Sequence, residues 1–578
     1  MANFTQTSLI GTIATVILSL GACSSEQLAS DKSPPNIQLS IPQLPPLPAM
    51  AEVANFSMQS DAEERSIKKG RLFKNNQLLG HNIDFIPAPS PSSETYANYK
   101  DNNTIRTSKE RVSTFSIDVD TGAYSNMRRI LQAGSLPPRD AIRIEELINY
   151  FSYDYDGEES QDQPFSVNTE IAPSPWNEKT HLLQIGLKGF SPDSLNEKAA
   201  NLVFLIDVSG SMDSPNKLGL LKSSISLLSN QLTASDTVSI VVYAGSSGTV
   251  LEPTPGDQKK IIHNALARLN AGGSTHGEAG IELAYQIALE NFIIDGTNRV
   301  ILATDGDFNV GISDIEKLKQ LIAGKRKSGI ALTTLGFGSG NYNDQLMEQL
   351  AQEGNGNYAY IDTLSEARKV LVDELESSLL TIAEDVKIQV EFNPATVSEY
   401  RLIGYTNRHL ANEDFDNDKV DAGEIGAGHT VTALYEIALA GQMGNKHSAN
   451  RYEPTLARPT DINVDEIAHV RLRYKLPSQR NSLLLAKIIS KDQIQHAFDN
   501  ATKDYRFAAS VAAFGQLLRQ SPHLNNFSFD KLRAMAKQAT GSDNFGYRQE
   551  FIRLIEVAES LNQIERATLT PQTDHGRG

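Results

Sequence analysis

The sequence predicts an α/β fold in which a doubly wound parallel sheet forms the centre of the chain. Two uninterrupted apolar runs, Leu202–Ile206 and Val300–Ala303, have the length and composition of buried strands. Because strands and helical patterns alternate from about residue 200 to 378, helices are expected on both faces of the sheet. The clearest helical face, with apolar residues three and four positions apart, consists of Leu218, Leu221, Ile225, Leu228 and Leu232.

The first 22 residues have the features of a signal peptide. Their apolar stretch, Leu9–Leu20, is too short to span a bilayer as a helix but suits an export signal. The segment Leu20–Cys23 resembles the lipobox of bacterial lipoproteins, in which the cysteine is acylated, and Cys23 is the only cysteine of the chain. The two serines that follow resemble outer-membrane sorting in Gram-negative bacteria. We therefore expect a cell-envelope protein anchored to the membrane through Cys23; a buried, inert cysteine is the alternative.

Residues 23–111 are predicted to form a lipid-anchored tether. They contain the proline-rich stretches SPPNIQLSIPQLPPLPA and FIPAPSPSS, which favour extended polyproline II conformations and cannot bury a core. At the other end of the chain, residues 564–578 are expected to be a frayed tail.

Strand and helix patterns also flank the central region. Residues 112–165 are predicted to form an N-terminal domain with a strand, a turn and two helices separated by Pro137-Pro138. Residues 166–198 and 379–480 contain alternating apolar runs typical of a β-sandwich, and residues 481–563 have a helical pattern. We expect the two strand-rich flanks to pair with each other and to carry the central domain as an insertion. Gly189 and Ala383 would then be near neighbours.

Polar side chains follow the two apolar strands of the central region. Asp207, Ser209 and Ser211 stand directly after the first strand, and Asp305 ends the second. Thr275 lies between them in the glycine-rich segment GGSTHGEAG. Ligands of open α/β sheets bind at the carboxyl ends of the strands, and alternate side chains of an extended loop point the same way. Carboxylate and hydroxyl oxygens at such an edge suit a hard divalent cation such as Mg²⁺.

The order D-x-S-x-S, a lone threonine and T-D-G resembles the metal-ion-dependent adhesion site of von Willebrand factor type A (VWA) domains. The resemblance covers residues 199–378 and includes further strands at 238–243, 330–337 and 358–361. It implies that one coordination position of the metal stays open for an Asp or Glu carboxylate of a protein partner. It also implies a metal-binding set of Ser209, Ser211 and Thr275, with Asp207 and Asp305 bound directly or through water. The alternative is that Asp207 and Ser209 merely cap the following helix.

The flanks resemble a family of bacterial lipoproteins, the YfbK-type proteins. The segment LPPRDAIRIEELINYF carries the pattern of the domain that precedes VWA in that family. FNPATVSEYRLIGY and NFGYRQEFIRLIEVAE resemble its C-terminal domain. The resemblance extends over about residues 110–560 and implies an architecture more than an activity.

Several other chemistries are disfavoured. The formal net charge of −17 argues against nucleic acid as the main partner. The Asp-Thr-Gly at 120–122 has no second copy, which an aspartic protease needs. The run Asp414–Asp418 begins like an EF-hand, but Lys419 and Ile425 replace the required Gly and Glu. There is no phosphate-binding glycine loop and no G-x-S-x-G motif, so neither a nucleotide site nor a serine triad is expected.

These observations predict an exported, lipid-anchored binding protein and not an enzyme. Its VWA site is expected to hold a divalent cation, Mg²⁺ first with Mn²⁺ or Ca²⁺ as alternatives, and to bind a carboxylate-bearing protein. Two other classes stay open: an envelope scaffold in which the metal is structural, and an enzyme such as a hydrolase in the N-terminal block. Binding that is lost in chelator favours the first class, and binding that is indifferent to chelator favours the scaffold.

Overall fold

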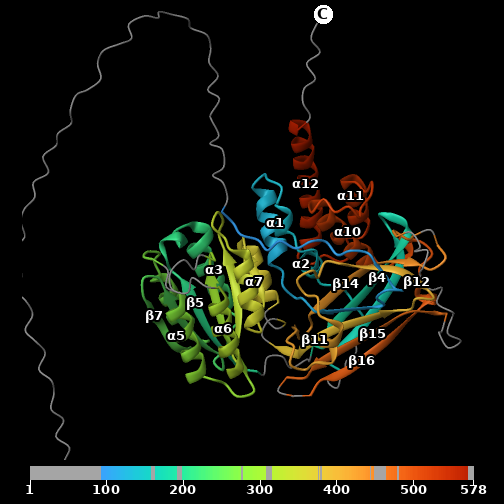
Figure 1. The fold of residues 1–578 in the computed structure, drawn as a ribbon. Helices are drawn as coiled ribbons and strands as arrows, with labels where there is room; N and C mark the ends of the chain where they lie inside the picture. Colours follow the sequence, from blue (N-terminus) through green and yellow to red (C-terminus); the bar gives the residue numbers. More distant parts are fainter. Residues whose placement is uncertain are drawn as a thin grey trace, which may run out of the picture. The chain divides into compact units, whose positions relative to one another are not determined.

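In the computed structural model, the middle of the sequence forms a six-stranded mixed sheet, which lies at the left in Figure 1. Its strand order is β10-β9-β8-β5-β6-β7, and only β7 pairs in an antiparallel manner. Every residue of β5 is buried, as its uninterrupted apolar run predicts. The strands are β5 (Ala200–Asp207), β6 (Thr237–Tyr243), β7 (Ser247–Pro255), β8 (Thr297–Thr304), β9 (Ala331–Phe337) and β10 (Tyr358–Ile361).

The structure describes most of the chain after residue 92. Several predicted features lie outside the described residues: the signal peptide, Cys23, most of the tether, Thr275 and the tail from residue 570. The described residues are 93–157, 163–191, 198–274, 277–306, 315–374, 377, 380–442, 444–447, 464–477, 479 and 481–569.

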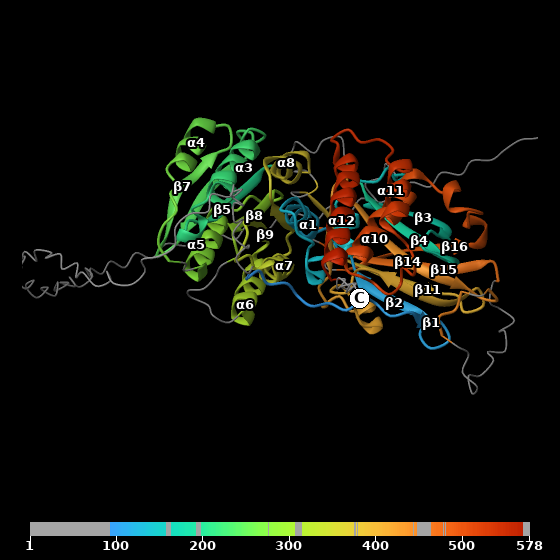
Figure 2. The ribbon, with the colours of Figure 1, turned by 90° about the horizontal axis from the view of Figure 1, so that it is seen from above.

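Helices cover both faces of this sheet, which confirms the predicted doubly wound arrangement (Figure 2). Phe204 and Ile206 of β5 share a core with one group of helices, whereas Val203 and Leu205 face the other group. The first group is α3 (Leu220–Ser229), α4 (Lys259–Ala267) and α8 (Leu364–Arg368). The second group is α5 (Gly277–Glu290), α6 (Ile315–Lys325) and α7 (Asp344–Glu353).

The flanking strands form two further sheets that enclose one apolar core. The first sheet has the order β1 (Ile105–Arg106), β12 (Val397–Ile403), β14 (Thr430–Leu439), β4 (Asn177–Gly189) and β3 (Phe165–Ser174). The second contains β13 (Gly423–Gly426), β11 (Thr381–Phe392), β15 (Glu466–Lys475) and β16 (Leu483–Ser490), with β2 (Val112–Ser116) also paired to β11.

The two flanks pair across the inserted VWA region, as the sequence predicts. β4 precedes the VWA sheet and β14 follows it, and they pair in an antiparallel manner with Ile185 opposite Ala433. The ends of the insertion also meet, because a Cβ added to Gly189 would lie 2.9 Å from Cδ1 of Ile382, the neighbour of Ala383. The sandwich therefore holds both ends of the VWA domain.

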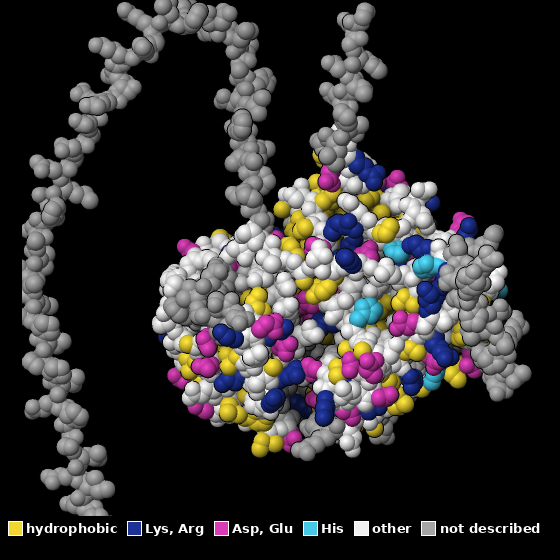
Figure 3. All heavy atoms as spheres, in the orientation of Figure 1, with side chains coloured by type: hydrophobic (Ala, Val, Ile, Leu, Met, Phe, Trp, Pro, Cys, Tyr) yellow, Lys and Arg dark blue, Asp and Glu magenta, His cyan; other side chains and the backbone are white. Residues whose placement is uncertain are grey.

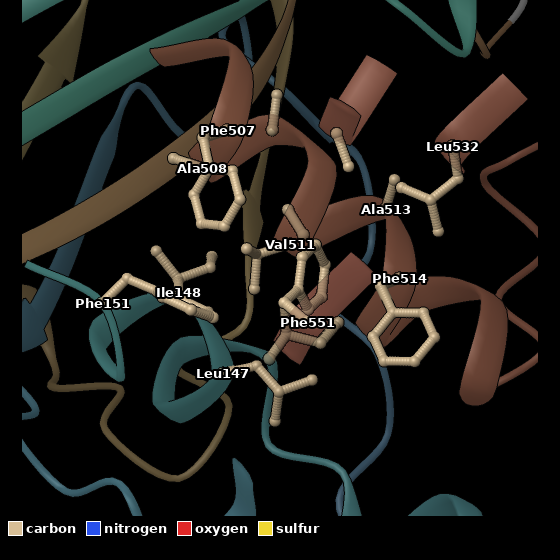
Figure 4. Packing of buried hydrophobic residues seen from close by; sticks show 14 of the residues in the cluster. Leu147, Ile148, Phe151, Phe507, Ala508, Val511, Ala513, Phe514, Leu532 and Phe551 are labelled. Atoms are coloured by element: carbon tan, nitrogen blue, oxygen red, sulfur yellow. The ribbon is translucent and has the colours of Figure 1, made fainter. Parts of the chain in front are cut away.

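The N-terminal block does not form a domain of its own. Its helices α1 (Gly122–Gln132) and α2 (Ile144–Asn149) share a core with α10 (Lys503–Leu518), α11 (Phe529–Gln538) and α12 (Tyr547–Leu569). Figure 4 shows the packing of α2 against these C-terminal helices. Phe151 makes edge-to-face contacts with Phe507 and Phe551, at ring-centroid distances of 4.9 and 5.6 Å. The sequence predicts two separate regions here, because the apolar face of a short helix does not reveal which distant segment packs against it.

Two predicted boundaries are wrong. The sequence predicts a tether that extends to residue 111, but the last part of this segment is folded: β1 pairs with β12, and the Ser93 amide donates to the Gly340 carbonyl. The expected sandwich ended at residue 480, yet β16 adds another strand to it. The run LLLAKIIS lacks strict alternation, so its periodicity does not distinguish a strand from a helix.

Short helical turns complete the fold. Two are π-helical, η4 (Pro215–Gly219) and η6 (Lys369–Asp373). The others are η1 (Arg139–Ala141), η3 (Gly210–Met212), η5 (Arg326–Ser328), η7 (Asn412–Asp416), η8 (Lys491–Gln493) and η9 (Phe498–Asn500). Among the described residues, every helix is too short or too polar to cross a membrane. Acidic and basic side chains are intermixed on the face shown in Figure 3.

Candidate metal centre

The two aspartates of the predicted site leave neighbouring parallel strands at the same sheet edge. β5 and β8 pair with Ile206 opposite Ala303, so Asp207 and Asp305 both stand at the carboxyl ends of their strands. Neither side chain is accessible to solvent. The structure therefore brings these two predicted residues to the place where α/β sheets bind ligands.

Hydrogen bonds hold the Asp207 carboxylate in place. Its Oδ1 accepts from the Ser209 amide at 2.8 Å, and its Oδ2 accepts from the Thr304 hydroxyl at 2.8 Å. The Tyr243 hydroxyl also donates to Oδ2, at 3.4 Å. Burial raises the pKa of Asp207, and the Asp305 charge raises it further, whereas the bonds from Ser209 and Thr304 lower it. A cation at this point would offset the cost of keeping two buried carboxylates charged.

The two serines converge as their spacing predicts. Ser209 is buried and Ser211 is partly buried, and their Oγ atoms lie 3.0 Å apart. Two oxygens that bind Mg²⁺ at about 2.0–2.1 Å and at right angles are roughly 2.9 Å apart. The hydroxyl pair therefore fits adjacent positions around such an ion.

The segment before Thr275 lies against the D-x-S-x-S loop. The Gly272 amide donates to the Val208 carbonyl at 2.7 Å, and the Gly210 amide donates to the Gly273 carbonyl at 3.1 Å. Gly273 has a φ of 88°, which favours glycine at this turn. Thr275 lies outside the described residues, so its expected role as a ligand stays a prediction.

Sequence reasoning missed two residues of the site, Lys217 and Asn341. The Lys217 ammonium lies 2.8 Å from Oδ2 of Asp305 and 3.2 Å from Oδ1 of Asn341. Asn341 also donates to Oδ2 of Asp305, at 3.3 Å. Both residues follow ordinary turn sequences. Because they lie far from Asp305 along the chain, no local sequence pattern indicates that they contact it.

A second acidic cluster is present, at Asp118, Asp120 and Glu146. All three residues are buried, and one oxygen from each lies within 4.8 Å of the others. Arg408 donates to Asp118 at 3.0 Å and to Asp120 at 2.8 Å, while Arg143 forms an ion pair with Glu146. Because each of these carboxylates already has an arginine as its partner, the cluster is better described as a buried ion-pair network than as a metal site.

The acidic loop that begins like an EF-hand also has protein cations as partners. Arg473 forms ion pairs with Asp416 and Asp418 at 3.4 and 3.0 Å. Lys387 donates to the backbone carbonyls of Asp414 and Asn417. These contacts agree with the rejection of an EF-hand on sequence grounds.

Comparisons with known proteins agree with this architecture. The family model of the von Willebrand factor type A domain matches residues 201–374, and a model described as von Willebrand factor matches 90–184. A third, described as "Uncharacterized protein YfbK, C-terminal", matches 377–561. The fold and these matches define a protein built around a VWA domain.

One relative covers most of the chain. The sequence is 45% identical to YfbK of Escherichia coli K12 over 483 residues, which are 82% of this chain and 83% of that protein. The chain belongs to the YfbK family. Mouse inter-alpha-trypsin inhibitor heavy chain H3 is 26% identical over 275 residues, 43% of this chain but only 30% of that protein. A solved von Willebrand factor type A structure from Catenulispora acidiphila has a TM-score of 0.39 and 13% identity, over 68% of this chain and 89% of that chain.

Proposed function

We propose that this protein binds a partner protein through a divalent cation held at the carboxyl edge of the VWA sheet. The observation that carries the proposal is the convergence of Asp207, Ser209, Ser211 and Asp305 at one edge. The donors are all oxygen atoms, which favours Mg²⁺, with Mn²⁺ or Ca²⁺ as alternatives. Thr275 is proposed as a further ligand.

The bound cation would supply an electrophilic position for an Asp or Glu carboxylate of the partner. The two carboxylates match the charge of a divalent ion, and the Lys217 ammonium beside Asp305 then makes the site as a whole positive. Lys217 and Asn341 hold the Asp305 carboxylate from the protein side. This donor set favours recognition of an anion over catalysis.

We further propose that the protein acts at the cell envelope as a lipoprotein, anchored through Cys23. The proline-rich segment after Cys23 would then separate the folded part from the membrane. Stable anchoring needs more than one acyl chain, because a single chain gives only marginal membrane binding. Metabolic labelling with a tagged fatty acid tests this assignment: wild type is expected to be labelled and Cys23→Ala is not.

One observation supports the alternative of an envelope scaffold. Buried ion pairs join the VWA domain to the N-terminal block: Arg143 with Asp344, and Arg128 with Asp362 and Glu366. A domain held this firmly can serve as an assembly platform without a metal-dependent ligand. The two functions differ in their response to chelator.

Affinity capture from solubilised membranes separates these functions. The purified chain with Mg²⁺ is expected to retain a specific partner that is released by EDTA or by excess acetate. Asp207→Ala should retain none, whereas Asp257→Ala should behave as wild type. Asp257 is a suitable control because it is exposed and follows Pro255, which pairs with Thr237 at the opposite edge of the sheet. Capture that resists EDTA and survives Asp207→Ala would support the scaffold and contradict the metal-dependent function.

A further inference from the structure

Lys217 is positioned against the proposed metal centre by the fold itself. It lies in η4, a π-helical turn, and its side chain is only 10% exposed. Turns of this type are often found at functional sites. Its ammonium reaches the buried Asp305 carboxylate, 88 residues away in the chain.

Gly338 makes the space for this side chain. A Cβ at Gly338 would come within 2.2 to 2.8 Å of three Lys217 side-chain carbons, Cγ, Cδ and Cε. Gly338 also has a φ of 80°, and the Tyr360 hydroxyl donates to its carbonyl. The stem of Lys217 therefore occupies a slot, and its head group is directed to Asp305 and Asn341.

We propose that Lys217 sets the balance between cation affinity and ligand affinity at the VWA site. This inference rests on the proposed metal-dependent function. The positive charge of Lys217, held beside Asp305, opposes entry of a divalent cation, because like charges repel strongly at a poorly solvated site. Once the cation is bound, the same charge adds to the field that attracts an anion. Lys217 thus weakens metal binding and strengthens carboxylate binding at the same site.

Two affinities, measured separately on the purified full chain, test the proposal. The first is the Kd for Mn²⁺, from electron paramagnetic resonance of the free ion. The second is the Kd of the Mn²⁺-loaded protein for acetate, from titration calorimetry. Lys217→Met keeps the aliphatic stem and removes the charge. It is expected to bind Mn²⁺ about tenfold more tightly and acetate several-fold more weakly, since both changes follow from loss of one nearby positive charge.

Two control variants define the result. Lys217→Arg retains the charge and should keep both affinities close to wild type. Lys260→Met removes a charge from an exposed position of α4, away from the site edge, and should change neither affinity. Thermal unfolding of all variants checks that they are folded.

The outcomes separate the inference from the function on which it rests. If wild type binds Mn²⁺ and Asp305→Ala does not, but Lys217→Met binds Mn²⁺ no more tightly than wild type, the inference fails and the metal site stands. If Lys217→Met has both affinities weakened, Lys217 only supports the local structure, and the inference also fails. If wild type and Lys217→Met both bind no Mn²⁺, the proposed function and the inference fail together.

Discussion

At the scale of single residues, the proposed metal site depends on a few buried oxygens with fixed partners. The Asp207 carboxylate accepts three hydrogen bonds, whereas the Asp305 carboxylate is paired with the ammonium group of Lys217. This asymmetry suggests different roles: Asp207 orders the loop that carries the serines, and Asp305 contributes charge.

We predict that Asp305→Ala abolishes divalent-cation binding while the fold persists. The change removes a buried carboxylate from the edge of the sheet but leaves the β5–β8 pairing intact. Mn²⁺ titration should show no saturable binding, and circular dichroism should match wild type. The control is Asp257→Ala, an exposed aspartate at the opposite edge. Saturable Mn²⁺ binding by Asp305→Ala would contradict the assignment.

Glu145 predicts a pH dependence of stability. It is buried, its Oε1 has no hydrogen-bond partner among the described residues, and burial together with the Asp118 charge raises its pKa to about 7. The folded protein therefore binds a proton that the unfolded chain, with a Glu pKa near 4.3, releases. This contribution to stability is complete below about pH 4 and is lost as the pH rises to about 7.

Urea unfolding across this pH range measures the effect. Glu145→Gln should flatten the curve between about pH 4.5 and 7 by as much as roughly 3 kcal/mol, because the amide does not titrate. Glu413→Gln, at an exposed position, should leave the curve unchanged. An unaltered pH dependence in Glu145→Gln would show that other groups cause it.

At the scale of elements, the pairing of β4 with β14 joins the part of the sandwich that precedes the VWA domain in the chain to the part that follows it. Leu183 on β4 lies opposite Tyr435 and is completely buried, whereas Leu484 on β16 is 57% exposed. We predict that Leu183→Ala lowers the free energy of unfolding by about 2–5 kcal/mol through lost burial and a cavity. Leu484→Ala should change it by less than about 0.5 kcal/mol. Equal effects in denaturant unfolding would mean that this pairing is not part of the stable core.

At the scale of the whole molecule, buried ion pairs couple the VWA domain to its flanks. Arg143 and Asp344 are both almost fully buried, and Arg143 also pairs with Glu146. These ion pairs join helix α2 of the N-terminal block to α7 of the VWA domain, so the two parts should unfold together.

Loss of Arg143 should weaken this coupling. Arg143→Met leaves two buried carboxylates without their guanidinium partner, and the expected cost is about 3–5 kcal/mol. Arg111→Met, which removes a 60%-exposed partner of Glu391, should cost less than about 1 kcal/mol. Denaturant unfolding followed by tryptophan fluorescence and by far-ultraviolet circular dichroism gives the measurement. A change of similar size in both variants would argue against a network that couples the domains.

The sequence by itself determined the VWA sheet and most of the residues that we propose for its metal site. Buried parallel strands appear as unbroken apolar runs, and Asp207, Ser209, Ser211 and Asp305 follow those runs, so the runs together with the resemblance to the VWA motif are enough to find them. The pairing of the flanks was also predictable, because strand patterns stood on both sides of a recognisable domain.

Only the tertiary structure decided which distant residues complete these features. Lys217 reaches Asp305 across 88 residues, and Arg408 reaches Asp118 across 290. β2 joins the sandwich and α1 joins the C-terminal helices because each has an apolar face that a remote segment covers. Periodicity shows that a face is apolar or that a residue is charged. It does not show the partner, because the partner is determined by chain topology and packing.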